Sequence, residues 1–170
     1  QGSIFKLVVA YQALLERYQM LKEAQQSLAN INPLTLIDSL QWHPKPKSVD
    51  QVLGYTLDGR PIKRLYKGGN LLKSHPNIGK IDIMGAIEQS SNMYLSILTA
   101  DHLQDPLNLV YGARNFGFGE KTGIELPGEI SGSLPDDLTH NKDGLYAFAI
   151  CQHSLVVTPL QTAVMLGAIA

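Results

Sequence analysis

A serine and a lysine stand three residues apart at the start of the chain, in the sequence Gln1-Gly2-Ser3-Ile4-Phe5-Lys6. Residues i and i+3 share one face of a helix, so this spacing predicts that the Lys6 amine lies beside the Ser3 hydroxyl. A serine hydroxyl is almost entirely un-ionised at neutral pH and needs an adjacent base to become a nucleophile. The pair therefore predicts acyl transfer in which Ser3 is acylated and Lys6 takes its proton, provided that apolar neighbours lower the lysine pKa.

Chance is the alternative explanation, because at average amino-acid composition the probability of finding one Ser-x-x-Lys in a chain of this length is roughly one half. A second polar group, Ser90-Ser91-Asn92, lies between apolar segments at 83–89 and 93–98 that predict two helices. The junction of two packed helices can present short polar side chains to a substrate. The competing interpretation is that Ser90 and Asn92 only cap these helices, the commonest role of such residues at helix ends.

Two longer segments complete a pattern. Residues 116–129 read Phe-Gly-Phe-Gly-Glu-Lys-Thr-Gly-Ile-Glu-Leu-Pro-Gly-Glu, and residues 157–163 read Val-Thr-Pro-Leu-Gln-Thr-Ala. With Gly2-Ser3-Ile4-Phe5-Lys6 and Ser90-Ser91-Asn92, these four blocks span the chain in one order. In that order the sequence resembles the class B (monofunctional) penicillin-binding proteins, the peptidoglycan D,D-transpeptidases.

The resemblance implies an α+β fold of the penicillin-binding-protein and serine β-lactamase type, with this chain mainly its α-helical part. Residues 1–170 would then be a partial transpeptidase domain, running from the Ser-x-x-Lys motif to the helix after Thr-Pro-Leu-Gln. Residues 30–80 would be a variable insertion within it, a surface segment with no chemistry of its own.

The resemblance also implies the catalytic residues Ser3, Lys6, Ser90 and Asn92. Ser3 would attack a peptidoglycan stem peptide ending in D-Ala-D-Ala, Lys6 would take the proton, Ser90 would relay protons, and the Asn92 amide would hold a substrate carbonyl. Further expected partners are β-lactam antibiotics and other cell-wall synthesis proteins, such as a glycosyltransferase. The expected location is the bacterial cytoplasmic membrane, with the catalytic domain facing the periplasm or the cell exterior and the anchor outside this sequence. A serine β-lactamase, a β-lactam sensor domain and a non-catalytic scaffold of a cell-wall synthesis complex remain alternatives.

The tripeptide Lys121-Thr122-Gly123 spells the third motif of the superfamily, which in the family lies on a strand lining the active site. Here the flanking glycines and proline between residues 117 and 128 predict turns instead. We therefore expect this copy to be remote from Ser3 and catalytically irrelevant. The family places the true motif beyond the Thr-Pro-Leu-Gln helix, so residues 1–170 are expected to lack it and to be nearly inactive by themselves.

Two positions depart from the family pattern. Gln1 stands where a proline usually precedes Gly-Ser, and Cys151-Gln152-His153 replaces the usual Gly-Gln-Gly. If those glycines adopt positive φ, cysteine and histidine at the same positions would strain the turn. We interpret Cys151 as a small buried residue, because His153 at i+2 would not share a helix face with it as a base.

Apolar periodicity and turn residues predict the remaining elements. We expect a long helix over residues 3–28, with a break near 17–19, and a β-hairpin over residues 53–66 with Asp58-Gly59 in its turn. A further helix is expected from Asp105-Pro106 to about residue 115. Thr158-Pro159-Leu160-Gln161 predicts a capping box. It begins a helix whose apolar side chains are expected to be buried, namely Val164, Met165, Leu166 and Ile169.

Composition narrows the classes of function. The chain has 14 Lys and Arg against 15 Asp and Glu, a balance that gives no electrostatic case for nucleic acid or a strongly charged surface. The single cysteine excludes an internal disulfide, and the five histidines show no paired spacing, so neither a metal nor a cofactor is expected. The apolar stretches of the chain are too short to span a bilayer. A content of 44% hydrophobic residues is typical of a globular protein.

Overall fold

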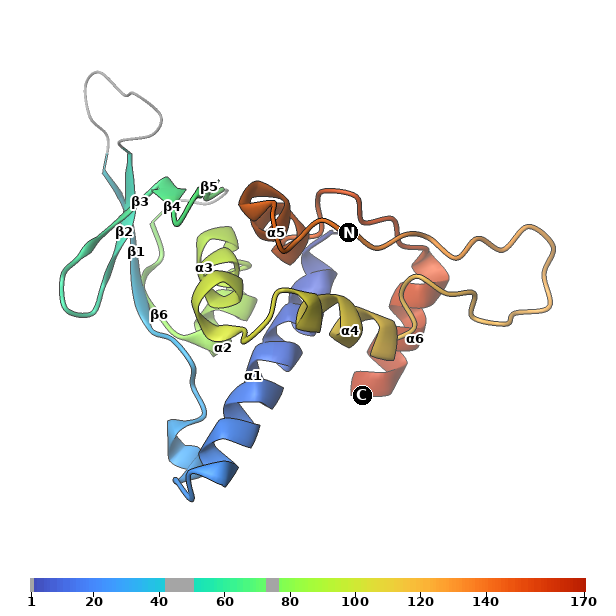
Figure 1. The fold of residues 1–170 in the computed structure, drawn as a ribbon, viewed down its shortest axis with the longest axis horizontal. Helices are drawn as coiled ribbons and strands as arrows, with labels where there is room; N and C mark the ends of the chain where they lie inside the picture. The colour runs from blue at the N-terminus through green and yellow to red at the C-terminus, as the bar shows by residue number, and fades with distance from the viewer. Residues whose placement is uncertain (1, 42–50, 73–76) are drawn as a thin grey trace.

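The structure is a computed structural model that describes residues 2–41, 51–72 and 77–170, and its architecture is α+β (Figure 1). A small antiparallel sheet stands at one side of a group of helices, and a long loop between α4 and α5 extends from the opposite side. The elements of the described residues are the 3₁₀ turns η1 (Gly2–Phe5) and η2 (Leu28–Asn30), the helices α1 (Lys6–Glu23), α2 (Ile83–Glu88), α3 (Asn92–His102), α4 (Leu107–Asn115), α5 (Lys142–Ala149) and α6 (Pro159–Ile169), and the strands β1 (Leu36–Gln41), β2 (Val52–Thr56), β3 (Pro61–Lys63), β4 (Leu65–Tyr66), β5 (Gly69–Asn70) and β6 (Gly79–Ile81).

Helix α1 runs unbroken to Glu23, so the predicted break near residues 17–19 and the predicted end at residue 28 are both wrong. The apolar periodicity weakens there because the buried face carries a polar residue, Glu16, which is 4% exposed. Its carboxylate accepts hydrogen bonds from Gln12 Nε2 at 3.0 Å and from Asn108 Nδ2 at 2.9 Å. A buried carboxylate that is fully hydrogen-bonded does not interrupt a helix, although it removes the apolar signal from the sequence.

The sheet has the order β3-β2-β1-β6 with all neighbours antiparallel, and β4 and β5 form a separate two-stranded hairpin. The predicted hairpin is confirmed as β2 and β3, with Gly59 in its turn at a φ of 84°. Strands β1 and β6 were not predicted. Leu36 of β1 pairs with Thr56 of β2 on one side and with Ile81 of β6 on the other, so the sheet closes between segments 45 residues apart in the sequence.

The helices share one hydrophobic core, in which α3 is the central element. Its side chains from Met93 to Leu98 are buried, and it packs against α1, α2 and α5. The predicted start of α6 is confirmed, because Thr158 and Gln161 form a capping box. The predicted burial of its apolar residues is wrong except at Met165: Val164, Leu166 and Ile169 are exposed. Only the face that carries Gln161 and Met165, one turn apart, is buried against the described residues.

No helix within the described residues is both long enough and apolar enough to cross a membrane.

Candidate active site

The chain enters α1 through η1, which places Ser3 and Lys6 on one side of the same turn. In a 3₁₀ turn the side chains at i and i+3 are eclipsed, so the two residues project together. Ser3 is exposed, whereas Lys6 is only 3% exposed. Phe5, between them, is buried and packs on Phe118 at 5.6 Å and on Phe148 at 4.9 Å between ring centroids. These aromatic contacts fix the turn, so that a potential nucleophile faces solvent and an amine faces inward.

The buried Lys6 amine has three hydrogen-bond acceptors within reach. Its Nζ donates to the Ser90 carbonyl at 2.7 Å, to Ser90 Oγ at 2.7 Å and to Asn92 Oδ1 at 2.5 Å. Among the described residues no carboxylate forms an ion pair with it. Burial without a counter-charge lowers the pKa of the Lys6 amine from its ordinary value. Such an amine is suited to accept a proton.

The Ser90 hydroxyl connects this amine to Ser3. It donates to Ser3 Oγ at 2.9 Å while accepting from Lys6 Nζ at 2.7 Å. The structure has no direct hydrogen bond between the Lys6 and Ser3 side chains; both bond the same Ser90 hydroxyl, so their link passes through Ser90. The backbone of Ser90 has a φ of 55°, in the left-handed region that is uncommon outside glycine. Strained backbone of this kind is concentrated at functional sites.

The hydrogen bonds of Ser90-Ser91-Asn92 show which of these residues cap a helix and which contact Lys6. Ser91 is the N-cap of α3, and its hydroxyl accepts from the Tyr94 backbone N–H at 3.3 Å. Ser90 and Asn92, the two residues for which capping was the alternative, instead direct their side-chain oxygens to Lys6. The triplet therefore combines one structural residue with two that could do chemistry.

The turn at Cys151-Gln152-His153 packs against the segment that carries Ser3. Cys151 and His153 have φ values of 62° and 66°, so the condition for backbone strain at these two positions is met. A side chain on Gly2 would lie 3.2 Å from Cys151 Cβ and 3.4 Å from the carbonyl oxygen of Ile150, which makes glycine the residue that fits. Cys151 is half-buried, and burial raises the pKa of its thiol, in agreement with a packing residue.

The segment Lys121-Thr122-Gly123 lies in the long loop between α4 and α5 and not on a strand. The Glu129 carboxylate accepts from Thr122 N and Thr122 Oγ1, both at 2.6 Å, and from Gly123 N at 3.3 Å. These hydrogen bonds, the side-chain one first, hold the pKa of Glu129 below its usual range. Within the described residues Lys121 has no hydrogen bond to Ser3, Lys6 or Ser90, so this tripeptide stabilises a turn.

The aromatic and amide contacts behind the site were not identified as functional from the sequence. Phe118, from the Phe-Gly-Phe-Gly segment, packs on Phe5, and the Gln161 amide donates to the carbonyl oxygens of Glu120 and Ser131, each at 2.7 Å. Residues 116–129 and 157–163 thus attach the loop after α4 to the turn that carries Ser3 and to α6. The one available signal was a phenylalanine, Phe5, between the serine and the lysine of the first motif.

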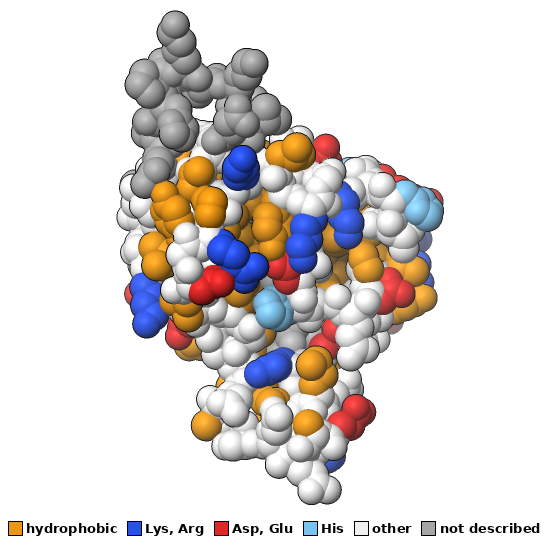
Figure 2. Space-filling view, turned by 60° about the vertical axis from the view of Figure 1, so that its left-hand side comes forward, with side chains coloured by type: hydrophobic (Ala, Val, Ile, Leu, Met, Phe, Trp, Pro, Cys, Tyr) orange, Lys and Arg blue, Asp and Glu red, His pale blue; other side chains and the backbone are white. Residues whose placement is uncertain are grey.

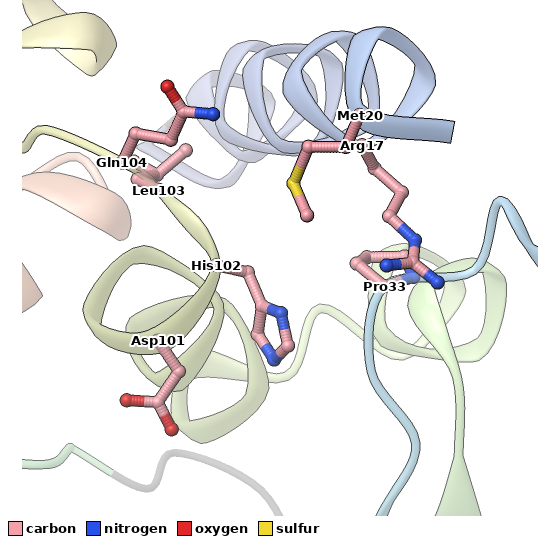
Figure 3. Close-up of a pocket in the computed structure, with 7 residues that line it drawn as sticks. All are labelled: Arg17, Met20, Pro33, Asp101, His102, Leu103 and Gln104. Atoms are coloured by element: carbon pink, nitrogen blue, oxygen red, sulfur yellow. The ribbon is translucent and has the colours of Figure 1, made fainter. Parts of the chain in front are cut away.

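A separate cavity of about 170 Å³ lies between the C-terminal parts of α1 and α3 (Figure 3). Arg17 and Met20 enter it from α1, and His102 enters it from α3. None of the predicted site residues lines it. The described residues contain no cluster of three or more His, Cys, Asp or Glu side chains that could hold a metal ion.

Comparison with known proteins gives one consistent family. Residues 61–170 match the model of the penicillin binding protein transpeptidase domain. Penicillin-binding protein H of Bacillus subtilis is 33% identical over 147 residues, which cover 73% of this chain and 20% of that protein. The chain thus spans about a fifth of the length of this curated relative.

Solved structures with low sequence identity share the fold. The transpeptidase domain of Burkholderia pseudomallei penicillin-binding protein 3 is similar over 99% of this chain and 40% of its own, with a TM-score of 0.61 and 19% identity. Pseudomonas aeruginosa PBP2 in complex with WCK 5153 is similar over 96% of this chain and 32% of its own, with a TM-score of 0.57 and 17% identity. Mycobacterium tuberculosis penicillin-binding protein 3 complexed with aztreonam covers 99% of this chain and 30% of its own, with a TM-score of 0.56 and 22% identity.

Proposed function

Because this chain belongs to the penicillin-binding protein transpeptidase family, we propose that it forms part of a peptidoglycan D,D-transpeptidase that works through an acyl-enzyme at Ser3. The observation that carries the proposal is a chain of hydrogen bonds that links Ser3 to Ser90 and Ser90 to Lys6. It ends at a buried amine without a counter-charge. An exposed hydroxyl connected to a base of lowered pKa is the arrangement that acyl transfer to serine requires.

In the first half-reaction, Ser3 Oγ attacks the carbonyl carbon of the penultimate D-alanine of a stem peptide. With Lys6 neutral, the Ser90 hydroxyl turns to donate to Lys6 Nζ and to accept from Ser3 Oγ, the reverse of the directions in the structure, because a hydroxyl can both donate and accept. The Ser3 proton then passes to Ser90 Oγ while the Ser90 proton passes to Lys6 Nζ. The backbone N–H of Ser3, at the start of the helical segment, would supply one hydrogen-bond donor to the developing oxyanion. The tetrahedral intermediate then expels D-alanine, whose nitrogen takes the proton back from Lys6 through Ser90.

In the second half-reaction, an amine from a neighbouring stem peptide attacks the acyl-Ser3 carbonyl. It loses one proton to the Lys6 relay, and Ser3 Oγ leaves with a proton from the same relay, so the enzyme is regenerated and the new amide is the cross-link. A β-lactam would acylate Ser3 by the same first step. Asn92 would hold a substrate carbonyl: its Oδ1 is occupied by Lys6, and among the described residues its Nδ2 has no acceptor.

Serine β-lactamase activity is the less favoured function, because it needs a carboxylate that activates water next to the acyl bond. The described hydrogen bonds of Ser3 and Lys6 involve only Ser90 and Asn92. Glu129, in the loop after α4, is bound to the turn at Thr122 and Gly123.

We extend the proposal to the surroundings of the domain. Residues 1–170 would be one part of a transpeptidase domain at the outer side of the bacterial cytoplasmic membrane, working with other cell-wall synthesis proteins such as a glycosyltransferase. Within residues 1–170, Lys121-Thr122-Gly123 does not join Ser3, so this part by itself should be acylated slowly.

The test is labelling with a fluorescent penicillin, followed by peptide mapping of the label. The protein that contains this chain should be labelled at Ser3, and Ser3→Ala should abolish labelling while leaving the melting temperature unchanged. Rapid hydrolysis of a chromogenic cephalosporin would instead indicate a β-lactamase. Labelling that persists in Ser3→Ala would refute the assignment of the nucleophile.

A further inference from the structure

The near-neutral total charge conceals an uneven distribution along the chain. Residues 51–80 contain six of the 14 Lys and Arg residues but only one of the 15 Asp and Glu residues, Asp58. This stretch supplies β2 to β6, so most of its charge lies on the sheet side of the molecule. Figure 2 turns that side forward and shows Lys and Arg side chains grouped over it. The composition-based exclusion of a strongly charged surface therefore does not hold for this part.

Four cations follow one another along the chain and form what we call the basic strip: Arg60, Lys63, Arg64 and Lys67. Arg60, Lys63 and Lys67 are exposed. Arg60 pairs with Asp58 at 2.8 Å with both side chains largely in solvent, and Lys67 pairs with Asp101 at 2.5 Å. The exposed Arg60–Asp58 pair is weak and exchanges readily, whereas Asp101 is 21% exposed and also accepts from the Tyr66 hydroxyl, so Lys67 is held more firmly. Lys63 and Arg64 form no ion pair with any described residue.

The Lys67 end of the strip is fixed rigidly to α5. Gly69 of β5 lies so close to this helix that a Cβ on it would be 2.8 Å from Tyr146 Cε2. The Asn70 backbone N–H donates to Asp143 Oδ1 at 2.5 Å, and the Tyr146 hydroxyl donates to the Tyr66 carbonyl at 2.9 Å. The β4–β5 hairpin therefore holds Lys67 at the N-terminal end of α5.

The opposite end of α5 leads to the nucleophile. The helix has eight residues, so it is about 12 Å long at about 1.5 Å per residue. Directly after it, Ile150 and Cys151 contact the segment at Gly2, beside Ser3. The basic strip thus extends outward from a point roughly one short helix away from the proposed nucleophile.

From this placement we infer that the basic strip binds the peptidoglycan strand whose stem peptides react at Ser3, an inference that rests on the proposed function. Each uncross-linked stem peptide ends in a free carboxylate, so such a strand is a flexible polyanion. The exposed side chains of Arg60, Lys63 and Lys67, spaced along one short stretch, complement repeated carboxylates. A polymer held there lies roughly one short helix from Ser3, which raises the local concentration of stem peptides at the nucleophile.

An anionic membrane surface is the alternative partner, because Leu57 and Leu65 are exposed near the same cations and basic groups beside apolar ones favour lipid interfaces. The position of the strip favours the strand. Its inner end is attached to the helix that leads to the active site, whereas membrane binding would require no such connection.

The experiment measures binding of the whole protein to isolated peptidoglycan by sedimentation at low and high salt, with Ser3→Ala in every arm to prevent covalent capture. Arg60→Gln with Lys63→Gln should weaken binding about tenfold at low salt and much less at high salt, because exposed charges are screened. Lys22→Gln with Arg114→Gln removes one lysine and one arginine from exposed positions on α1 and α4, and should leave binding unchanged. Equal losses in both double variants would overturn the inference.

Two further arms do not depend on the folding of a variant. Peptidoglycan whose carboxylates have been converted to amides should bind the protein more weakly than untreated peptidoglycan, and equal binding would refute the inference. The second arm uses vesicles of phosphatidylcholine with phosphatidylglycerol, and any binding of the protein to them should be the same with and without the double variant Arg60→Gln with Lys63→Gln. If the double variant abolishes vesicle binding while peptidoglycan binding persists, the strip is a membrane surface.

Penicillin labelling separates this inference from the proposed function. With Ser3 intact, labelling should be the same in the parent and in both double variants. A parent that is not labelled at Ser3 would refute the proposed function itself. A labelled parent whose peptidoglycan affinity does not depend on Arg60 and Lys63 would refute only the role of the strip.

Discussion

Removal of the Ser90 hydroxyl should stop acylation while leaving the rest of the site in place. Ser90 Oγ is the group between Ser3 Oγ, at 2.9 Å, and Lys6 Nζ, at 2.7 Å. In Ser90→Ala, the Lys6 amine keeps the Ser90 carbonyl and Asn92 Oδ1 as acceptors, so it should stay where it is. The nucleophile would then have no route to its base.

Loss of a positioned proton-transfer group typically lowers a rate by about 10²–10⁴-fold, and we expect the second-order rate of labelling by a fluorescent penicillin to fall within this range. The backbone at residue 90 provides a second readout. Its φ of 55° costs alanine about 1 kcal/mol or more but suits glycine. Ser90→Gly should therefore be more stable than Ser90→Ala by about 1 kcal/mol, a difference of about 2–4 °C in melting temperature for a domain of this size.

The matched control is Ser91→Ala. Ser91 has the same side chain and is the next residue, but its hydroxyl caps α3. Loss of this cap should cost about 1 kcal/mol of stability and leave the acylation rate of the folded protein close to that of the parent. Acylation of Ser90→Ala and Ser90→Gly within about threefold of the parent would show that the hydroxyl is not in the proton pathway, since a relay contributes about a hundredfold or more.

Four further outcomes are expected. Lys121→Ala should change the acylation rate by no more than about twofold, as for an ordinary surface substitution, because its tripeptide only binds Glu129; a large loss in the same labelling assay would place it in the active site. The acylation rate should rise with pH through the pKa of Lys6, which lies below the ordinary 10.5, because only the neutral amine accepts a proton; Lys6→Arg, which stays charged, should be inactive at every pH measured. Phe5→Ala should lower the free energy of unfolding by about 3–5 kcal/mol in a denaturant titration, since it removes a ring that packs on two others. Gly69→Ala should lower it by about 1–3 kcal/mol because its Cβ would overlap Tyr146, whereas Gly59→Ala, whose Cβ meets open space but whose φ is 84°, should cost only about 1 kcal/mol of backbone strain.

Most of the helices and the β2–β3 hairpin were predictable because their signals are local, whereas α5 and the β4–β5 hairpin were not predicted. The Thr158 capping box, the Asp58-Gly59 turn and the helix before Gly117 each depend on residues within one or two turns of each other. Strands β1 and β6 have no such signal. Each is a short segment stabilised by pairing across the variable stretch, as between Leu36 and Ile81, and that pairing is invisible in a local window.

The α6 error has a related cause. Periodicity indicates which residues are apolar, but the burial of Val164 and Leu166 depends on what packs beside them, and the described residues cover only the Met165 face. The same limitation applies to Glu16, whose burial is possible because Gln12 and Asn108 reach it from the same helix and from α4. A sequence window contains neither the covering surface nor the distant hydrogen-bond donor.

The members of the candidate site were predictable from type and spacing, but the way they connect was not. Ser3 and Lys6 share a turn, as their spacing required, yet the buried Lys6 amine and the exposed Ser3 hydroxyl have no direct hydrogen bond. The missing link comes from Ser90, 87 residues away from Ser3, whose left-handed backbone presents both its carbonyl and its hydroxyl to Lys6. Local spacing can therefore identify a candidate nucleophile and a candidate base, whereas the hydrogen-bonded path between them is a property of the tertiary fold, which is why Ser90 is the position whose substitution tests the proposed mechanism most directly.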